Sequence, residues 1–268
     1  MGRIVASYVT CNSIDTIESS LNSVIDLVDF IVTVDGAYVG LPVPDDHSFD
    51  GTVDLVNSVV GKKGVLIQPE ERLTEPQSRN LCLQFVQGRF PEGWMFWIDS
   101  DEVLHDARDE FKWLHKQENS RYQIIHLRRD DASAYRWYGY HLHTSLADRT
   151  PFHPRLYGGI PGLHFAENHW TLRDRSGDRV EPKYASYTLR NAWLEHRRGT
   201  RSRKNLDAIN YYNTYERWKY ERTIRPLKSY IPYPLERTTK DICYRGHIPA
   251  EHFLHFVFEH TWGGRTRD

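Results

Sequence analysis

Cysteine is scarce in this chain of 268 residues, and long apolar runs are absent. The three cysteines, Cys11, Cys82 and Cys243, lie far apart and are odd in number. This favours free thiols in a reducing compartment over a disulfide framework or a cysteine-rich zinc site. No apolar run approaches the roughly 20 residues that a membrane-spanning helix needs, and the apolar stretch after Met1 is too short for a secretory signal. The sequence therefore predicts a cytoplasmic protein without a transmembrane segment.

Neither sign of charge is in excess overall, but the charges are unevenly distributed. The formal net charge is −1, and 39% of the residues are hydrophobic, which is enough for a large core. Residues 1–110 hold 7 Lys and Arg against 19 Asp and Glu, whereas residues 190–268 hold 16 against 9. An acidic first part and a basic last part suit a site that holds a metal cation together with an anionic ligand. Two solvated surfaces of different charge would give the same counts.

The first hundred residues alternate between strand and helix patterns. Apolar, largely β-branched runs indicate buried strands, and apolar residues at helical spacing separate them. This alternation predicts an α/β fold with a Rossmann-like, mostly parallel sheet covered by helices on both faces. In such sheets, ligands bind beyond the carboxyl ends of the strands. The expected strands are Ile4–Thr10, Phe30–Val34, Gly64–Gln68 and Trp94–Ile98, and the expected helices run from Asn12 or Ser13 to Leu27, over Thr52–Val60 and over Glu75–Gln87.

The pattern changes after residue 120. Tyr122–Leu127 is a clear strand, Ala134–His143 and Arg155–Tyr157 are weaker ones, and residues 202–221 have the spacing of an amphipathic helix. Frequent prolines near the end of the chain predict irregular structure with a short terminal helix. We therefore predict one domain over residues 1–200 and a helical or irregular C-terminal extension, residues 201–268, packed on it.

Three carboxylates, Asp99, Asp101 and Glu102, follow directly on the strand Trp94–Ile98. Like charges this close repel one another, so such a cluster at a strand end indicates a cation. Alternate residues of an extended chain point to the same side, so Asp99 and Asp101 can address one ligand. Two carboxylates with a diphosphate and water suit Mn²⁺ or Mg²⁺. The alternative is a turn followed by the acidic start of a helix.

Four short motifs follow one another in the first 105 residues. They are Thr10-Cys11-Asn12, Asp35 with Ser48-Phe49-Asp50-Gly51-Thr52, Ser78-Arg79-Asn80, and Asp99-Ser100-Asp101-Glu102 after an apolar strand. In this order and spacing they resemble the family 2 glycosyltransferases, which have the GT-A fold. The resemblance covers at least residues 3–105.

The resemblance implies a reaction and a set of site residues. A family 2 enzyme moves a sugar from a UDP- or GDP-sugar to an acceptor hydroxyl, usually with inversion, by direct displacement with one base. The implied metal ligands are Asp99 and Asp101, with His196 completing the metal or diphosphate site, and the implied cofactor is Mn²⁺ or Mg²⁺. The implied nucleotide-binding residues are Thr10, Asp35, Arg79 and Asp99.

A base must also accept the proton of the acceptor hydroxyl. The segments Pro154-Arg155-Leu156-Tyr157 and Gly162-Leu163-His164 resemble a family stretch that often ends in His-Glu, but Phe165 takes the place of the Glu here. Glu167, two residues on, is the predicted base, with His164 or His169 as alternatives. Glu167 would otherwise be a solvated loop residue.

Two other classes of protein share parts of this pattern. A sugar nucleotidyltransferase has the same alternation, but a Gly-rich basic loop would follow its first strand, and Thr10–Asp15 has none. A non-enzymatic carbohydrate- or nucleic-acid-binding protein would suit the aromatic residues and the basic run Arg197–Lys204, and the pair His141 and His143 would suit zinc. The acceptor stays open: a glycan, a lipid-linked saccharide, a protein or a modified nucleic acid base.

Overall fold

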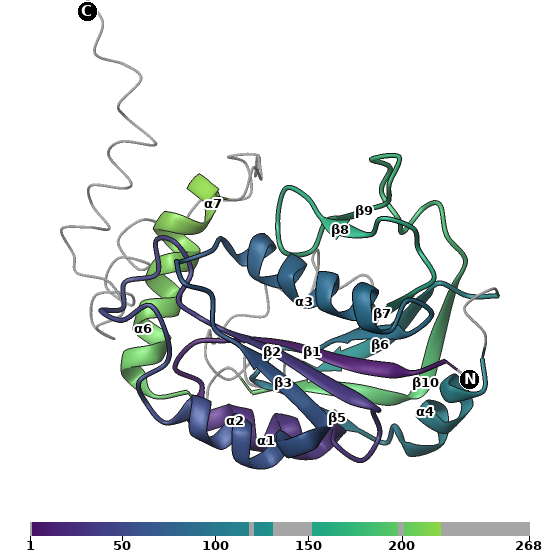
Figure 1. The fold of residues 1–268 in the computed structure, drawn as a ribbon, viewed down its shortest axis with the longest axis horizontal. Helices are drawn as coiled ribbons and strands as arrows, with labels where there is room; N and C mark the ends of the chain where they lie inside the picture. Colours follow the sequence, from purple (N-terminus) through teal and green to yellow (C-terminus); the bar gives the residue numbers. More distant parts are fainter. Residues whose placement is uncertain (1, 118–120, 131–151, 198–200, 221–268) are drawn as a thin grey trace, which may run out of the picture.

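The computed structural model describes residues 2–117, 121–130, 152–197 and 201–220 (Figure 1). Among these residues, eight strands form one sheet in the order β3-β2-β1-β4-β7-β6-β10-β5, and β8 pairs with β9 separately. The strands are β1 (Ile4–Thr10), β2 (Phe30–Asp35), β3 (Gly64–Ile67), β4 (Trp94–Trp97), β5 (Glu102–His105), β6 (Ile124–Asp130), β7 (Phe152–Gly158), β8 (His164–Phe165), β9 (Leu172–Arg173) and β10 (Ser186–His196). The helices are α1 (Ile14–Val24), α2 (Thr52–Val60), the 3₁₀ turn η1 (Gly61–Lys63), α3 (Glu75–Arg89), α4 (Arg108–His115), α6 (Arg203–Tyr211), the π-helical stretch η3 (Tyr212–Glu216) and α7 (Arg217–Tyr220).

The sheet is parallel on one side and mixed on the other. Strands β3, β2, β1 and β4 are parallel to one another. Strand β7 is antiparallel to both β4 and β6, β6 is parallel to β10, and β5 is antiparallel to β10. The predicted α/β class with a largely parallel sheet is confirmed, and the four expected strands of the first half match to within one residue.

Alternate residues of the central strands face two separate helix layers. Ile4, Ala6 and Tyr8 of β1 belong to the core that includes α1, α2 and α4, whereas Val5 belongs to the core that includes α3. Figure 1 shows α1 and α2 on one face of the sheet and α3, with β8 and β9, on the other. Side chains alternate along a strand, so a strand covered on both faces must be apolar almost throughout.

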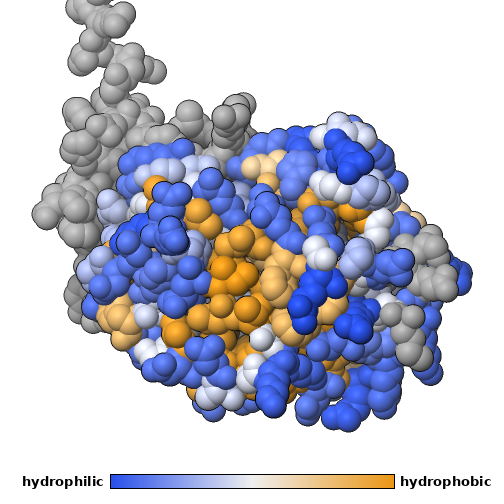
Figure 2. Space-filling view, viewed as in Figure 1, coloured by the Kyte–Doolittle hydropathy of each residue, from blue (hydrophilic) through white to orange (hydrophobic). Residues whose placement is uncertain are grey.

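The edge strand β3 is only half-buried. All four of its residues have intermediate exposure, and Figure 2 shows an apolar area in the middle of the face where Figure 1 places this strand. An open strand edge can pair with another chain, and the shortness of β3 limits that risk.

Helix α3 begins with a capping box. The Thr74 side chain accepts a hydrogen bond from the Gln77 backbone, and the Gln77 side chain accepts one from the Thr74 backbone. Pro76 lies in the first turn, where a missing N–H costs no helical hydrogen bond. These features fix the first turns of α3, which carry Glu75 and Arg79.

Three local expectations differ from the structure. Helix α1 ends at Val24, because the chain turns after that residue to enter β2. Glu102 begins strand β5, which pairs with β10, so the acidic start of a helix is wrong. The helix expected over residues 202–221 is interrupted by the π-helical stretch η3.

Several expectations lie partly or wholly outside the described residues. These are the strand Ala134–His143 with its zinc candidates, most of the C-terminal extension, and Cys243. Tyr212 packs against Ala37 and Leu41, so the beginning of the predicted extension contacts the sheet domain, and the division at residue 200 remains a prediction. Cys11 and Cys82 are free thiols. None of the described helices is long and apolar enough to cross a membrane.

Candidate active site

The carboxyl ends of β1, β2 and β4 meet at one edge of the sheet. Thr10 pairs with Asp35 across β1 and β2, and Ser7 pairs with Trp97 across β1 and β4. The chain then leaves β4 through residues 99–101. The Ser100 hydroxyl in that stretch contacts the Ser13 hydroxyl at 3.1 Å. The strand ends that carry the sequence motifs are therefore neighbours in space.

Asp35 is fully buried and holds the loop that follows β2. Its carboxylate accepts hydrogen bonds from the Thr10 hydroxyl (2.9 Å) and from the Ser48 backbone (3.0 Å) and hydroxyl (2.5 Å). Asn12 donates from its backbone to Ser48 Oγ (2.7 Å) and accepts from the backbone of Phe49 (3.1 Å). The Ser-x-Asp-Gly-Thr stretch is thereby fastened to the turn after β1. Nucleotide binding by Thr10 and Asp35 remains a prediction.

Arg79 reaches Asp99 across the face of Trp97. Its guanidinium carbon lies 3.7 Å from the centroid of the Trp97 ring, and its Nη2 lies 3.0 Å from both Asp99 Oδ1 and Glu75 Oε1. Trp97 Nε1 also donates to Asp99 Oδ1 at 3.2 Å. Burial raises the pKa of Asp99, but Arg79 and Arg155 lower it by more, to about 2. Asp99 is therefore charged at neutral pH, and 29% of its side chain stays exposed.

Glu102 is fully buried between two arginines. Its Oε1 lies 2.5 Å from Arg155 Nη2 and 3.3 Å from Arg129 Nε, and its Oε2 accepts from the Asp99 backbone at 3.0 Å. Burial raises the pKa of Glu102 despite these cations. Glu102 is thus a supporting residue that holds the backbone of Asp99 and the guanidinium of Arg155 in place.

Asp101 faces cations that come from the end of β10 and beyond it. Its Oδ2 lies 3.1 Å from Arg201 Nε and 3.5 Å from His196 Nε2, and its carbonyl accepts from the Arg197 backbone. Register explains the proximity, because β10 places His196 opposite Glu102 of β5. Burial raises the pKa of Asp101, but Arg201 and His196 hold it well below its usual range.

A divalent cation would find part of its ligand set here. Among the residues that the structure describes, no group of three or more His, Cys, Asp and Glu is arranged to hold a metal ion. Asp99 and Asp101 nevertheless supply the hard oxygen atoms that Mn²⁺ and Mg²⁺ prefer, and His196 lies beside Asp101. The remaining ligands would come from a diphosphate and water. A cation held by these residues would have to replace the ion pairs that Asp99 makes with Arg79 and Asp101 makes with Arg201.

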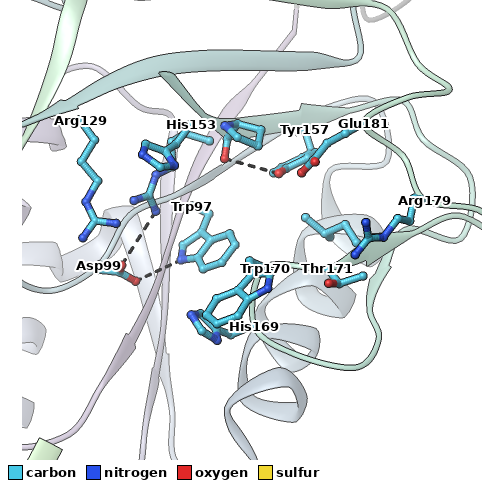
Figure 3. A pocket seen from close by; sticks show the side chains of 13 residues that line it. Trp97, Asp99, Arg129, His153, Tyr157, His169, Trp170, Thr171, Arg179 and Glu181 are labelled. Carbon is cyan, nitrogen blue, oxygen red and sulfur yellow. Dashed lines mark hydrogen bonds and ion pairs between the residues drawn. The ribbon is translucent and has the colours of Figure 1, made fainter. Parts of the chain in front are cut away.

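A cavity of about 510 Å³ opens beside Asp99. Figure 3 shows Trp97 in its middle, Asp99 to the left of Trp97, and Arg179 and Glu181 at the opposite end. Aromatic rings and cations dominate its wall, which suits a polar ligand with apolar faces, such as a sugar. The lining residues are Trp97, Asp99, Arg129, His153, Pro154, Arg155, Tyr157, His169, Trp170, Thr171, Leu172, Arg179 and Glu181.

The predicted base, Glu167, does not line this cavity. Arg173 contacts its Oε1 through Nε at 2.9 Å and through Nη2 at 2.5 Å. The hydrogen bond from Arg173 lowers the pKa of Glu167, which weakens it as a base. Of the two alternatives, His164 is bonded through Nδ1 to the carbonyl of Gly162 and lies outside the lining, whereas His169 is part of it.

Most of the lining residues were not predicted as site residues, and Arg155, Arg129 and Glu181 are charged examples. Arg155 is foreshadowed by the Pro154–Tyr157 motif. Arg129 has no recognisable sequence signal, because only the pairing of β6 with β10 brings it to His196, where its Nη2 lies 2.7 Å from Nδ1. Glu181 lies after the segment in which the base was sought, and its side chain is exposed.

Neither a protein-family model nor a curated protein matches this chain. Solved structures resemble it distantly. The crystal structure of S. aureus TarS 1-349 is 13% identical and covers 91% of this chain and 79% of its own, with a TM-score of 0.43. The mannosyltransferase PcManGT from Pyrobaculum calidifontis, in complex with GDP-Man and Mn²⁺, is 15% identical, with 98% and 82% covered and a TM-score of 0.45.

A putative glucose-1-phosphate thymidylyltransferase from Bacillus anthracis is 10% identical, with 83% and 79% covered and a TM-score of 0.34. Similarities this weak identify no family.

Proposed function

We propose that this protein is a glycosyltransferase that moves a sugar from a UDP- or GDP-sugar to an acceptor hydroxyl. One observation carries the proposal: Asp99 and Asp101 lie among basic side chains at the carboxyl edge of a largely parallel sheet, and Asp99 lines a cavity of about 510 Å³. Such an edge is where α/β sheets bind their ligands. The aromatic wall of the cavity offers faces on which a sugar ring can stack.

The donor's diphosphate needs its charge neutralised when it leaves. Asp99, Asp101 and His196 would hold Mn²⁺ or Mg²⁺, which when bound would stabilise the charge on the leaving diphosphate. Arg201 and Arg79, freed from these carboxylates, would add positive charge on the same side. Thr10 and Asp35 would form the nucleoside side of the site through the loop that Asp35 holds.

Transfer would proceed by direct displacement with inversion, for which one base suffices. Glu167 is the base that the family resemblance favours, and its pairing with Arg173 argues against it. The acceptor is one of the classes named above, since the cavity accommodates a sugar ring without identifying what carries it.

The direct test is a thermal shift assay with UDP, GDP, UDP-glucose and GDP-mannose, each with and without Mn²⁺. We expect one nucleotide and its sugar to raise the melting temperature of the wild-type protein in the presence of Mn²⁺. Asp101→Ala should lose this stabilisation. Asp109→Ala is the matched control, because the Asp109 side chain is 96% exposed and does not line the cavity beside Asp99.

Mass spectrometry of the same mixtures would detect release of UDP or GDP and would identify the donor. Stabilisation without any turnover would favour a binding protein. Formation of pyrophosphate from a nucleoside triphosphate and a sugar phosphate would favour a nucleotidyltransferase, and either result would overturn the proposal.

A further inference from the structure

We infer that His169, positioned by Glu75, is the base that takes the proton of the acceptor hydroxyl. This inference rests on the proposed glycosyltransferase function and deepens it, because it assigns the proton transfer to a residue pair of the same site. It also replaces the carboxylate base that the family resemblance favours with an imidazole.

His169 is a nearly buried residue in the wall of the cavity. Only 13% of its side chain is exposed, and it lines the cavity. Its ring contacts Trp97 edge-on at 6.4 Å and Trp170 at 3.8 Å between centroids. Figure 3 shows the rings of His169 and Trp170 on one side of Trp97, with Asp99 to its left. The imidazole is therefore one indole away from the carboxylate that marks the leaving-group side.

A buried carboxylate, that of Glu75, lies beside His169. Its Oε2 lies 3.8 Å from Nδ1 of His169, and its Oε1 accepts from Arg79 Nη2 at 3.0 Å. Only 7% of the Glu75 side chain is exposed, and the capping box of α3 fixes the turn that holds it. This separation is longer than a hydrogen bond, so the contact is electrostatic: a buried carboxylate this close to the ring favours its protonated form and attracts the ring to its side. Glu75 is thus a positioning residue that joins the arginine on Asp99 to His169.

The other titratable groups of the cavity are less suitable. Glu181 is largely exposed and lies at the end of the cavity away from Asp99. Burial raises the pKa of Tyr157 well above its usual range, so its phenolate is inaccessible at neutral pH. His153, on β7, also lines the cavity and is the rival imidazole, so its variant is compared directly with that of His169.

Proton transfer to His169 accompanies the displacement at the anomeric carbon. The unprotonated nitrogen of His169 takes the proton of the acceptor hydroxyl while the hydroxyl oxygen forms a bond to the anomeric carbon. The bond from that carbon to the diphosphate oxygen breaks, and its electron pair leaves with the nucleoside diphosphate. The products are the glycoside, the nucleoside diphosphate and a protonated His169, which returns its proton to water.

Hydrolysis of the sugar nucleotide tests the assignment without a known acceptor, because water must lose a proton in the same way. We expect His169→Gln to lower the rate of hydrolysis of UDP-glucose or GDP-mannose with Mn²⁺ by about 100-fold, the usual contribution of a positioned base. The KM for the donor and the thermal shift with nucleotide should stay at wild-type values. His164→Gln, outside the cavity, should leave the rate unchanged.

Imidazole rescue separates a proton-transfer role from a structural one. His169→Ala should regain activity when imidazole is added. Added imidazole should not change the activity of Glu167→Gln, Glu181→Gln or His153→Gln. Glu75→Gln should slow hydrolysis by up to about 100-fold through misplacement of the ring. Glu75→Gln combined with His169→Ala should match His169→Ala in added imidazole, because a free imidazole needs no orienting carboxylate.

Full activity of His169→Gln would overturn the assignment, as would loss of activity in Glu167→Gln, Glu181→Gln or His153→Gln with His169→Gln unaffected. A weaker thermal shift with nucleotide in His169→Gln would also overturn it, since it would place His169 in donor binding. A wild-type protein that neither binds nor hydrolyses any nucleotide sugar would instead refute the proposed function itself.

Discussion

Two groups of carboxylates in this molecule obtain their cations in different ways. At the strand edge, Asp99, Asp101 and Glu102 are paired with arginines that lie 20, 100 and 53 residues away in the chain. In the segment around β8 and β9, Glu167 pairs with Arg173 and Asp174 with Lys183, only 6 and 9 residues away.

This difference in sequence separation distinguishes a candidate functional site from a loop whose ion pairs stabilise only the loop itself. In the local pairs at least one partner is about a third exposed, namely both residues of the Glu167–Arg173 pair and Lys183 beside the buried Asp174, and these pairs hold their own segment in shape. The strand-edge pairs are mostly buried and involve residues from several elements, and those of Glu102 and Asp101 form only when β7 and β10 have joined the sheet. A charged cluster that the whole fold maintains, next to a cavity, is the arrangement expected of a functional site.

The largest expected effect is on stability, at the buried pair Arg155 and Glu102. Arg155→Ala leaves the fully buried Glu102 with Arg129 as its remaining cation, and removal of one partner of a buried pair costs about 3–5 kcal/mol. Urea denaturation measures this loss. Arg155→Met combined with Glu102→Leu should recover much of it, because apolar residues can replace a buried pair. A loss of stability smaller than that of Arg173→Ala would show that the strand-edge pairs stabilise the fold no more than the local pairs do.

The next effect is on activity, at Asp101. Asp101→Ala should lower turnover of the donor by about 100-fold or more, because stabilisation of charge in the transition state is lost. Arg201 and His196 lose their buried carboxylate partner, so circular dichroism must show that the variant is folded at the assay temperature. Steady-state kinetics with Mn²⁺ measure the effect, and Asp109→Ala is the control. Wild-type turnover by Asp101→Ala would remove Asp101 from the metal site.

Acid should reveal the strand-edge pairs as well. The folded-state pKa of Asp99 is about 2, below its ordinary value of 3.8, so its ionised form stabilises the fold above the ordinary value. That stabilisation is lost as the pH falls through 3.8 towards 2. Asp99→Asn should therefore flatten the dependence of the unfolding free energy on pH in this window. A dependence equal to that of the wild-type protein would show that Arg79 and Arg155 do not lower the pKa.

The smallest effect is expected at the local pair. Glu167→Gln should cost less than about 1 kcal/mol of stability, because an ion pair that is a third exposed to solvent contributes little and salt screens it. It should also leave donor turnover at the wild-type rate. A 100-fold loss of turnover with intact donor binding would restore Glu167 as the base and remove His169.

Sequence patterns predicted the parts of the molecule whose signals are local. The strands of the first half are continuous apolar runs, and the carboxylates Asp99 and Asp101 follow one of them, so both the sheet and its acidic edge could be predicted. His196 came from the family resemblance, and the structure does place it beside Asp101.

The remainder depends on pairing between distant segments. Arg129 reaches the site because β6 lies beside β10, and Glu75 reaches His169 because α3 packs near β8. Glu167 is the nearest carboxylate to the family's usual position, but its proximity to Arg173 on the neighbouring strand was not visible in the residue pattern. The site could be predicted only in part, because folding, and not spacing along the sequence, determines which side chains contact one another there.

The position of β5 at the end of the sheet order has a consequence for synthesis of the chain. Strand β5 and the three carboxylates beside it leave the ribosome early, whereas β10 and Arg201 follow about 100 residues later. N-terminal segments begin to fold while the rest is being made. A nascent chain therefore carries β5 as an unpaired strand, with Asp101 lacking its cations, until β10 docks, and that one event both joins β5 to the sheet and brings His196 and Arg201 to the site.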